Sequence, residues 1–334
     1  MKILIRVDAS TAIGSGHVMR CLTLANRLKM ENNAIYFVMR DLAGNLIELV
    51  EKAGFTVFIL PRAAKRNDLT GYENWLTVKV ATDAAETLSV VKAKLGTVDR
   101  VIVDSYAIDC RWESVMREVA KEIMVIDDLA NRRHDADILL DQNFYRDKDT
   151  RYNGLVPANC KLLLGPENAL LREEFYAEKK RLRQRDGSLK NILVFYGGSD
   201  LTDETTKAIQ ALVLLHKECA ADFTVTVVVG LSNARREKIK KLCQKYSYIK
   251  YLCQVNNMAE LMNKTDLMLG AGGSTTWERL FLKVPALVTA VADNQVQGAI
   301  DCASAGIIDY LGLADEVTVD TIISAIKEKY LQSK

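Results

Sequence analysis

Short apolar runs alternate with segments of helical periodicity along this chain, and the alternation occurs twice. The first series starts with an apolar run at residues 3–7 and a helical pattern at 17–30, and it ends with a run at 162–164. The second series starts with the run at 192–195 and the helical pattern at 204–218. Such alternation predicts parallel sheets with helices on both faces. We therefore predict an α/β protein of two doubly wound, Rossmann-like domains facing a cleft, with residues 1–165 in the first and 166–334 in the second.

Three segments fit the alternation less simply. Residues 171–185 are rich in charge, which favours a solvated helix that crosses from one domain to the other. Residues 63–76 are turn-rich and predict no particular element. The final helix, expected at 319–331, could also pack back on the N-terminal domain. In doubly wound sheets the ligand lies beyond the carboxyl ends of the strands, so motifs directly after apolar runs carry the functional interpretation.

Composition narrows the class of protein. Hydrophobic residues make up 49% and charged residues 26%, which is typical of globular domains, and the net charge of +2 argues against an extended nucleic-acid surface. The seven cysteines form no C-x-x-C pair, which argues against a disulfide framework or a zinc site. The opening residues lack a signal-peptide layout, and no apolar stretch approaches the roughly 20 residues of a membrane span. We expect a cytoplasmic monomer without metal, cofactor, nucleic-acid partner or membrane partner.

The loop after the first apolar run ends in Gly14-Ser15-Gly16-His17, and three functional interpretations compete for it. A dinucleotide fingerprint is disfavoured because Met19 stands at its third glycine position, and a P-loop fails because no G-K-[ST] follows. The third interpretation is a catalytic histidine at a helix N-terminus, where the helix dipole favours the neutral imidazole that a general base needs. Arg20 follows one turn later. The plain alternative is that His17 merely lies near a helix start.

Two other histidines have weaker claims. His216 falls inside a predicted helix, which favours a structural role. His134 falls in a loop and is a secondary candidate. Polar residues also follow the apolar runs at 103–106 and 126–128; they either form turns and caps or line a sugar pocket together with His17.

Glycine-rich turns follow two apolar runs of the second half. Gly197-Gly198-Ser199 could cradle a phosphate with backbone amides, although Asp200 could simply cap the next helix. The segment 270–278 follows another run, and its turn and helix start could bind a diphosphate. Glu278 could then accept both hydroxyls of a ribose, while its spacing from Thr275 also fits a capping box. The residues 293–295 could cap a helix or reach the same site.

Taken in order, these motifs resemble the PseG family of UDP-sugar hydrolases of pseudaminic acid biosynthesis, and its spore-coat polysaccharide relatives. The matching segments are 7–10, 13–21, 103–106, 126–130, 141–143, 197–200, 272–276 and 293–295. The resemblance implies a GT-B fold and removal of UDP from UDP-2,4-diacetamido-2,4,6-trideoxy-β-L-altropyranose. It also implies that water attacks the anomeric carbon with inversion and that His17 is the general base. No part of this resemblance accounts for residues 62–73 or 179–185.

Residue roles follow from the motifs and the resemblance together. We expect His17, Tyr106 and Asn294 to be catalytic. Sugar binding is expected of Asp8, Gly14, Gly16, Arg20, Asp128, Asn143 and Gln295. UDP binding is expected of Gly197, Gly198, Ser199, Gly272, Gly273, Ser274, Thr275 and Glu278. Three alternatives stay open: a glycosyltransferase or spore-coat enzyme that uses another nucleotide sugar, a non-catalytic nucleotide-sugar binding protein, and an NAD(P) oxidoreductase.

Overall fold

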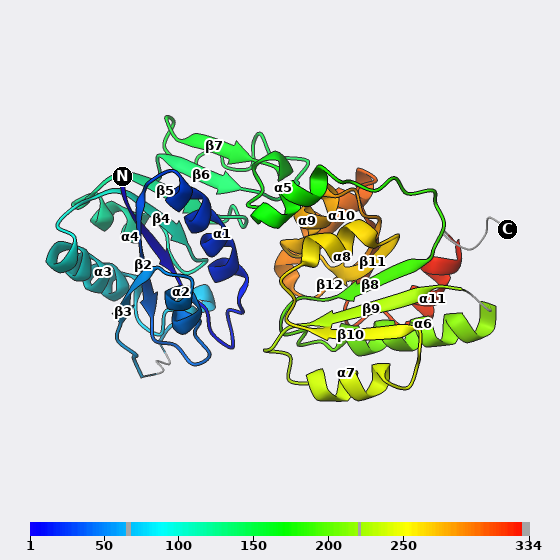
Figure 1. The fold of residues 1–334 in the computed structure, drawn as a ribbon. Coiled ribbons are helices and arrows are strands. Elements are labelled where there is room, and N and C mark those ends of the chain that lie inside the picture. Colours follow the sequence, from blue (N-terminus) through cyan, green and yellow to red (C-terminus); the bar gives the residue numbers. More distant parts are fainter. Residues whose placement is uncertain (65–67, 220–221, 329–334) are drawn as a thin grey trace. The chain divides into compact units, whose positions relative to one another are not determined.

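The computed structural model describes residues 1–64, 68–219 and 222–328, and it divides into two compact units (Figure 1). The first unit comprises Met1–Leu170 and the second Leu171–Lys334, whereas the sequence places the division after residue 165. No helix among the described residues is both long enough and apolar enough to cross a lipid bilayer.

The first unit is built on a seven-stranded parallel sheet of order β3-β2-β1-β4-β5-β6-β7. Its strands are β1 (Lys2–Val7), β2 (Ala34–Arg40), β3 (Thr56–Leu60), β4 (Val98–Asp104), β5 (Ala120–Ile126), β6 (Ile138–Asp141) and β7 (Lys161–Leu164). Its helices are α1 (Gly16–Met30), α2 (Ile47–Lys52), α3 (Val80–Lys94) and α4 (Cys110–Met116), with 3-10 turns η1 (Gly71–Trp75) and η2 (Pro166–Asn168).

The two faces of this sheet carry separate hydrophobic cores, which is why its central strands are apolar throughout rather than alternating. Ile3 and Ile5 of β1 pack with α1 and α2 on one face. Leu4 of the same strand packs with α3 and α4 on the other face, around the fully buried ring of Trp112. Figure 1 shows the two pairs of helices on opposite sides of the sheet.

The second unit is built on a six-stranded parallel sheet of order β10-β9-β8-β11-β12-β13. Its strands are β8 (Asn191–Phe195), β9 (Thr224–Val229), β10 (Ile249–Cys253), β11 (Leu267–Ala271), β12 (Ala286–Ala290) and β13 (Asp309–Leu313). Its helices are α5 (Glu173–Lys179), α6 (Glu204–Cys219), α7 (Arg236–Cys243), α8 (Met258–Lys264), α9 (Thr275–Phe281), α10 (Val296–Ser304) and α11 (Val319–Ile326), with the 3-10 turn η3 (Asp293–Gln295). One face is covered by α6, α7 and α11, and the other by α8, α9 and α10 (Figure 1).

The final helix has its apolar face occupied within the second unit. Ile322, Ile323 and Ile326 of α11 lie in the same core as Ala208 and Leu212 of α6. The part of the predicted helix beyond residue 328 lies outside the described residues.

The charged segment at 171–185 is not the solvated helix that its composition favours. Its helical part is only α5, and the chain then continues without regular structure. The guanidinium of Arg185 donates to the carbonyl oxygens of Thr265 and Leu282, at 2.7 and 3.1 Å, and Arg183 pairs with Asp266. These arginines therefore attach the segment to the second unit.

Candidate functional site

The carboxyl ends of neighbouring strands bring most of the predicted residues of the first unit together. Strand β1 pairs with β4 in a register that sets Val7 opposite Asp104, so the loop after β1 opens beside Asp104. Gly14 in this loop has φ +79°, a conformation that glycine adopts at little cost, and its amide donates to the Ser10 carbonyl at 2.8 Å. Gly16 then begins α1, so that His17 lies in the first turn of this helix.

His17 and Asp104 form a buried pair. The Nδ1 atom of His17 lies 2.6 Å from Oδ1 of Asp104, and the Asp104 side chain is fully buried. An ionised carboxylate only accepts hydrogen bonds, so we assign the ring proton to Nδ1. The other ring nitrogen, Nε2, is then the one that can take up a proton, which is the state a general base needs.

Arg20 keeps the Asp104 carboxylate ionised. Its Nε and Nη2 atoms donate to Oδ2 and Oδ1 of Asp104, both at 2.6 Å, and Nη1 donates to Asp128 at 3.1 Å. Burial by itself would raise the pKa of Asp104, but the charges of Arg20 and His17 outweigh it and hold this pKa well below its usual range. Asp104 is therefore an anion near neutral pH, and it can stabilise a positive charge that develops on the imidazole.

Tyr106 closes one side of the His17 ring. Its ring meets the imidazole edge-on, with centroids 4.8 Å apart, and its hydroxyl donates to Oδ1 of Asp128. Trp75 of η1 also meets the imidazole edge-on, at 5.9 Å. The predicted residues His17, Arg20, Tyr106 and Asp128 thus form one connected cluster at the ends of β4 and β5.

Asn143 lies at the end of the next strand, β6, close to a carboxyl group with an unusual environment. Its backbone amide donates to Oδ1 of Asp141 at 3.0 Å, and the Tyr152 hydroxyl donates to Oδ2 at 3.0 Å. Burial and the nearby charge of Asp128 raise the pKa of Asp141 to about 7. The Asp141 carboxyl group, at the end of β6, therefore holds a proton near neutral pH.

Asp8 is engaged by buried arginines at the end of β1. Its carboxylate accepts from the backbone amide of Arg40 at 2.7 Å and lies 2.8 Å from the guanidinium of Arg6. Both arginines also bind Asp83 of α3, which accepts from Trp112 as well. These contacts account for Asp8 structurally, and its role in sugar binding remains a prediction.

The other two histidines occupy different surroundings. His134 is buried, with Nδ1 2.7 Å from Oε1 of Glu113. His216 lies in α6 and stacks on Tyr248, with centroids 3.7 Å apart. Neither ring contacts Asp104 or Arg20 in the described part of the chain.

The two glycine-rich turns of the second unit follow adjacent strands, because β8 pairs with β11. Gly197 has φ +89°, and the carbonyl of Gly198 accepts from the Ser232 hydroxyl at 3.0 Å. A Cβ atom at Gly230 would lie 2.4 Å from the same carbonyl oxygen, so this turn packs too tightly against the end of β9 for any side chain there. Asp200 accepts from the amides of Glu204 and Thr205 at 3.0 and 2.9 Å, which confirms its alternative role as the cap of α6.

The second turn lies beside Gln295. A Cβ at Gly272 would meet the Gln295 side chain at 3.4 Å, and one at Gly273 would meet it at 3.7 Å. Oε1 of Gln295 accepts from the amide of Val291 at 3.1 Å, which fixes the side chain next to the turn. Asn294, in the same 3-10 turn, is exposed. The predicted residues Gly272, Gly273 and Gln295 are therefore neighbours.

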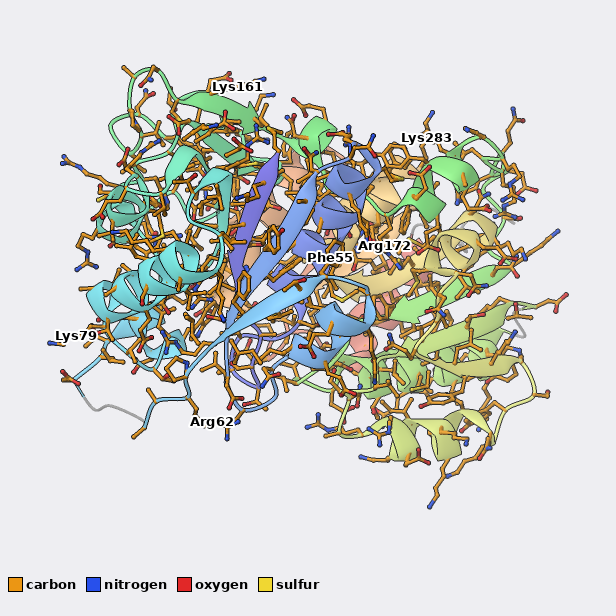
Figure 2. All side chains as sticks on the ribbon, turned by 60° about the vertical axis from the view of Figure 1, so that its left-hand side comes forward. Phe55, Arg62, Lys79, Lys161, Arg172 and Lys283 are labelled. Atoms are coloured by element: carbon orange, nitrogen blue, oxygen red, sulfur yellow. The ribbon has the colours of Figure 1, made fainter. Side chains whose placement is uncertain are left out.

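Glu278 does not cap α9. The N-cap of this helix is Ser274, and no side chain caps its amides. Instead Oε1 of Glu278 accepts from Nε and Nη2 of Arg172 at 3.2 and 3.1 Å; Arg172 is the N-cap residue of α5 and is labelled in Figure 2. Burial raises the pKa of Glu278 in spite of the opposing charge of Arg172. Because Thr275 lies inside α9 rather than at its N-cap, and no side-chain cap is formed, the capping-box alternative is wrong.

Three residues of these clusters were not assigned from the sequence. Asp104 stands in a segment recognised as polar, but its pairing with His17 depends on the adjacency of β1 and β4, which are not consecutive strands. Trp75 falls in the turn-rich segment for which no element was predicted. Arg172 belongs to the charged segment, where charge alone does not reveal a partner.

The two units together have the GT-B fold. Residues 192–333 match the model of the glycosyltransferase family 28 C-terminal domain. The chain is also similar to the crystal structure of MurG from Acinetobacter baumannii, with a TM-score of 0.63 and 14% identity over 98% of this chain and 90% of that one. These similarities confirm the predicted fold class of two Rossmann-like α/β domains.

Three relatives are similar in sequence. An uncharacterised protein of Methanocaldococcus jannaschii is 30% identical over 89% of this chain, which spans only 57% of that protein. The UDP-2,4-diacetamido-2,4,6-trideoxy-β-L-altropyranose hydrolase of Campylobacter jejuni is 26% identical, over 92% of this chain and 97% of its own. The spore coat polysaccharide biosynthesis protein SpsG of Bacillus subtilis is 29% identical over 52% of this chain and 51% of its own. The similarity to the hydrolase supports the resemblance seen in the motifs.

Proposed function

We propose that this protein is a nucleotide-sugar hydrolase that removes UDP from UDP-2,4-diacetamido-2,4,6-trideoxy-β-L-altropyranose. The observation that carries the proposal is the buried contact of 2.6 Å between Nδ1 of His17 and Asp104. Such a pair leaves Nε2 free to act as a base, and it needs no covalent intermediate on the protein. The similarity along nearly the whole chain to the Campylobacter jejuni hydrolase supports the choice of substrate.

The proposed reaction is a single displacement. A water molecule attacks the anomeric carbon while its proton passes to Nε2 of His17, and the bond from that carbon to the diphosphate oxygen breaks. UDP leaves with the bonding electron pair, and the sugar keeps the new hydroxyl with inverted configuration. Asp104 fixes the ring through Nδ1 and stabilises the imidazolium that forms, and Arg20 holds Asp104 in place.

We assign the sugar to the first unit and UDP to the second. In the first unit, Tyr106 and Asp128 lie against the imidazole and Arg20 and could contact sugar substituents. In the second unit, the backbone amides of the glycine-rich turns are assigned to the diphosphate, with Gln295 beside them. Glu278 is assigned to the ribose through Oε2, because the Arg172 contacts fall on Oε1.

A second candidate function uses the same base. The match of residues 192–333 to a glycosyltransferase domain is compatible with an enzyme in which His17 activates a hydroxyl of an acceptor rather than water. Fast release of UDP with no acceptor present would argue against this candidate, and turnover that requires an acceptor would establish it.

The decisive experiment is a panel of UDP-sugars incubated with the protein in oxygen-18 water, with the position of the label read by mass spectrometry. Attack at carbon puts the label in the sugar, and attack at phosphorus puts it in UDP. His17→Gln should abolish turnover while UDP binding survives. The matched control is His216→Gln, because His216 lies in α6 and stacks on Tyr248. Wild-type turnover by His17→Gln would exclude His17 as the base.

A further inference from the structure

Two aromatic side chains of η1, Tyr72 and Trp75, have no part in the mechanism described so far: Trp75 contacts the His17 ring, and Tyr72 packs on Trp75. We call them the aromatic wall. They belong to the segment at 62–76, which neither the periodicity nor the motifs explain. The Trp75 ring meets His17 at 5.9 Å and stacks on Tyr106 at 5.5 Å with an interplanar angle of 29°. Tyr72 meets Trp75 at 4.9 Å and Tyr106 at 5.2 Å. The wall thus continues the aromatic surface that begins at Tyr106.

The backbone around the wall is firmly held. Leu76 and Val80 are buried in the core of the first unit, and Oε1 of Glu73 accepts from the Val80 amide at 3.1 Å. Thr77 has φ +60°, a conformation that is uncommon for a β-branched residue and persists only where the surroundings impose it. This strained residue lies two positions after Trp75, the residue that meets the imidazole.

The wall is also accessible, which a purely structural aromatic cluster of this size would not need to be. Tyr72 is 36% exposed, and Trp75 is half-buried. The other two tryptophans, Trp112 and Trp277, are 0% and 5% exposed. Rings that stand open beside a candidate base, on a held backbone, are suited to contact a ligand through their faces.

We infer that Tyr72 and Trp75 bind the sugar of the nucleotide sugar through its apolar face and select sugars that carry methyl groups, such as 6-deoxy sugars, over hydroxyl-rich ones. This inference rests on the proposed function and goes further by naming the residues that set sugar preference. Contact between an aromatic face and the C–H groups of a sugar contributes favourably to binding. A sugar hydroxyl placed against the same face loses its hydrogen bonds to water and gains no hydrogen-bond partner in return. The two rings are specificity residues, since the base and its carboxylate partner lie elsewhere.

The first test measures contact directly. Because Trp112 and Trp277 are buried, acrylamide quenching of tryptophan fluorescence reports mainly on Trp75. UDP-N-acetyl-6-deoxyglucosamine should protect the fluorescence from quenching, and UDP alone should not. Binding of this UDP-sugar by calorimetry without protection of Trp75, or equal protection by UDP, would overturn the inference. If no UDP-sugar binds and none is hydrolysed, the proposed function fails and the inference falls with it, so the two failures are distinguishable.

The second test measures preference by titration, with UDP-N-acetylglucosamine and its 6-deoxy counterpart as the pair. Wild-type protein should bind the UDP-linked 6-deoxy sugar about 10-fold more tightly than UDP-N-acetylglucosamine. A factor of about 10 is the lower end of the discrimination that an apolar pocket achieves between ligands differing by one small group. Trp75→Leu and Tyr72→Leu should bring this ratio close to one and leave the Kd of UDP unchanged. Phe58→Leu is the matched control, because Phe58 stacks on Tyr36 in β2 at 5.9 Å. A ratio that the wall variants do not alter, or a wild-type ratio near one, contradicts the inference even if the variants turn over more slowly.

Discussion

Replacing Asp104 by asparagine removes one charge from the centre of the candidate site and keeps the shape of the side chain. In the wild-type protein the two carboxylate oxygens accept from three donors, each at 2.6 Å: Nδ1 of His17, and Nε and Nη2 of Arg20. An amide has only one oxygen, so its NH2 group must face either Arg20 or His17. Facing His17, it would donate to Nδ1 and move the ring proton to Nε2, which removes the base.

The expected loss in kcat follows from this move of the ring proton from Nδ1 to Nε2. A positioned general base contributes about 10²–10⁴-fold to kcat. That factor corresponds to about 2.7–5.4 kcal/mol of transition-state stabilisation. Arg20 keeps Asp128 as a carboxylate partner at 3.1 Å, so Asp104→Asn should still fold, with a stability loss of about 1.5–3 kcal/mol for a charged hydrogen bond.

The assay is release of UDP under saturating UDP-sugar, together with urea unfolding of each variant. Asp99→Asn is the matched control, because Asp99 lies on the same strand and accepts from Lys121 at 2.7 Å at the surface. We expect a loss in kcat for Asp104→Asn with little change in UDP affinity, and near wild-type kcat for Asp99→Asn. A folded Asp104→Asn variant with wild-type kcat would refute the assignment of Asp104 as the partner of the base.

Three further predictions concern stability and nucleotide binding. Asp83→Ala leaves Arg6 and Arg40 buried with one carboxylate fewer, and urea unfolding should show a loss of about 3–5 kcal/mol. In the folded protein the pKa of Asp141 is about 7, above its value in the unfolded chain, so the free energy of unfolding should fall as the pH rises from about 4 to 7. Asp141→Asn should flatten this pH dependence when urea unfolding is measured at several pH values. An unchanged pH dependence in this variant would contradict the prediction. Glu278→Ala should weaken UDP binding by about 10–100-fold in calorimetry, as expected for charged hydrogen bonds to a ribose, while exposed Glu260→Ala should bind UDP normally.

Much of the fold follows from the sequence because parallel strands buried on both faces read as uninterrupted apolar runs. The run at 192–195 is an example: it became β8, whose Ile192 and Val194 join the hydrophobic core on one face while Leu193 between them is also fully buried. The prediction was less accurate for the segment at 171–185, where the density of charged residues was the main feature of the sequence. The arginines at 183 and 185 look solvated in sequence, yet they bind carbonyl groups and Asp266 of the second unit.

The candidate site was predictable only in part, for a reason that concerns strand order. Gly14 and His17 are local signals, since a glycine loop followed by a helix start is visible in the sequence itself. Asp104 is 87 positions from His17, and only the crossover that sets β1 beside β4 brings them together. Trp75 gave no signal at all, because a short 3-10 turn has no periodicity that a sequence pattern could detect.

The burial of His17 has a consequence for chemical labelling. Its ring is covered by Tyr106 and Trp75, and the residue is only 8% exposed, while His134 is 3% exposed. His216 is the most accessible histidine of the three. A histidine-directed acylating reagent would therefore modify His216 first, and early labelling would leave turnover intact. Inactivation should follow only the later modification of His17, whose exposure lies between that of His216 and that of the more deeply buried His134.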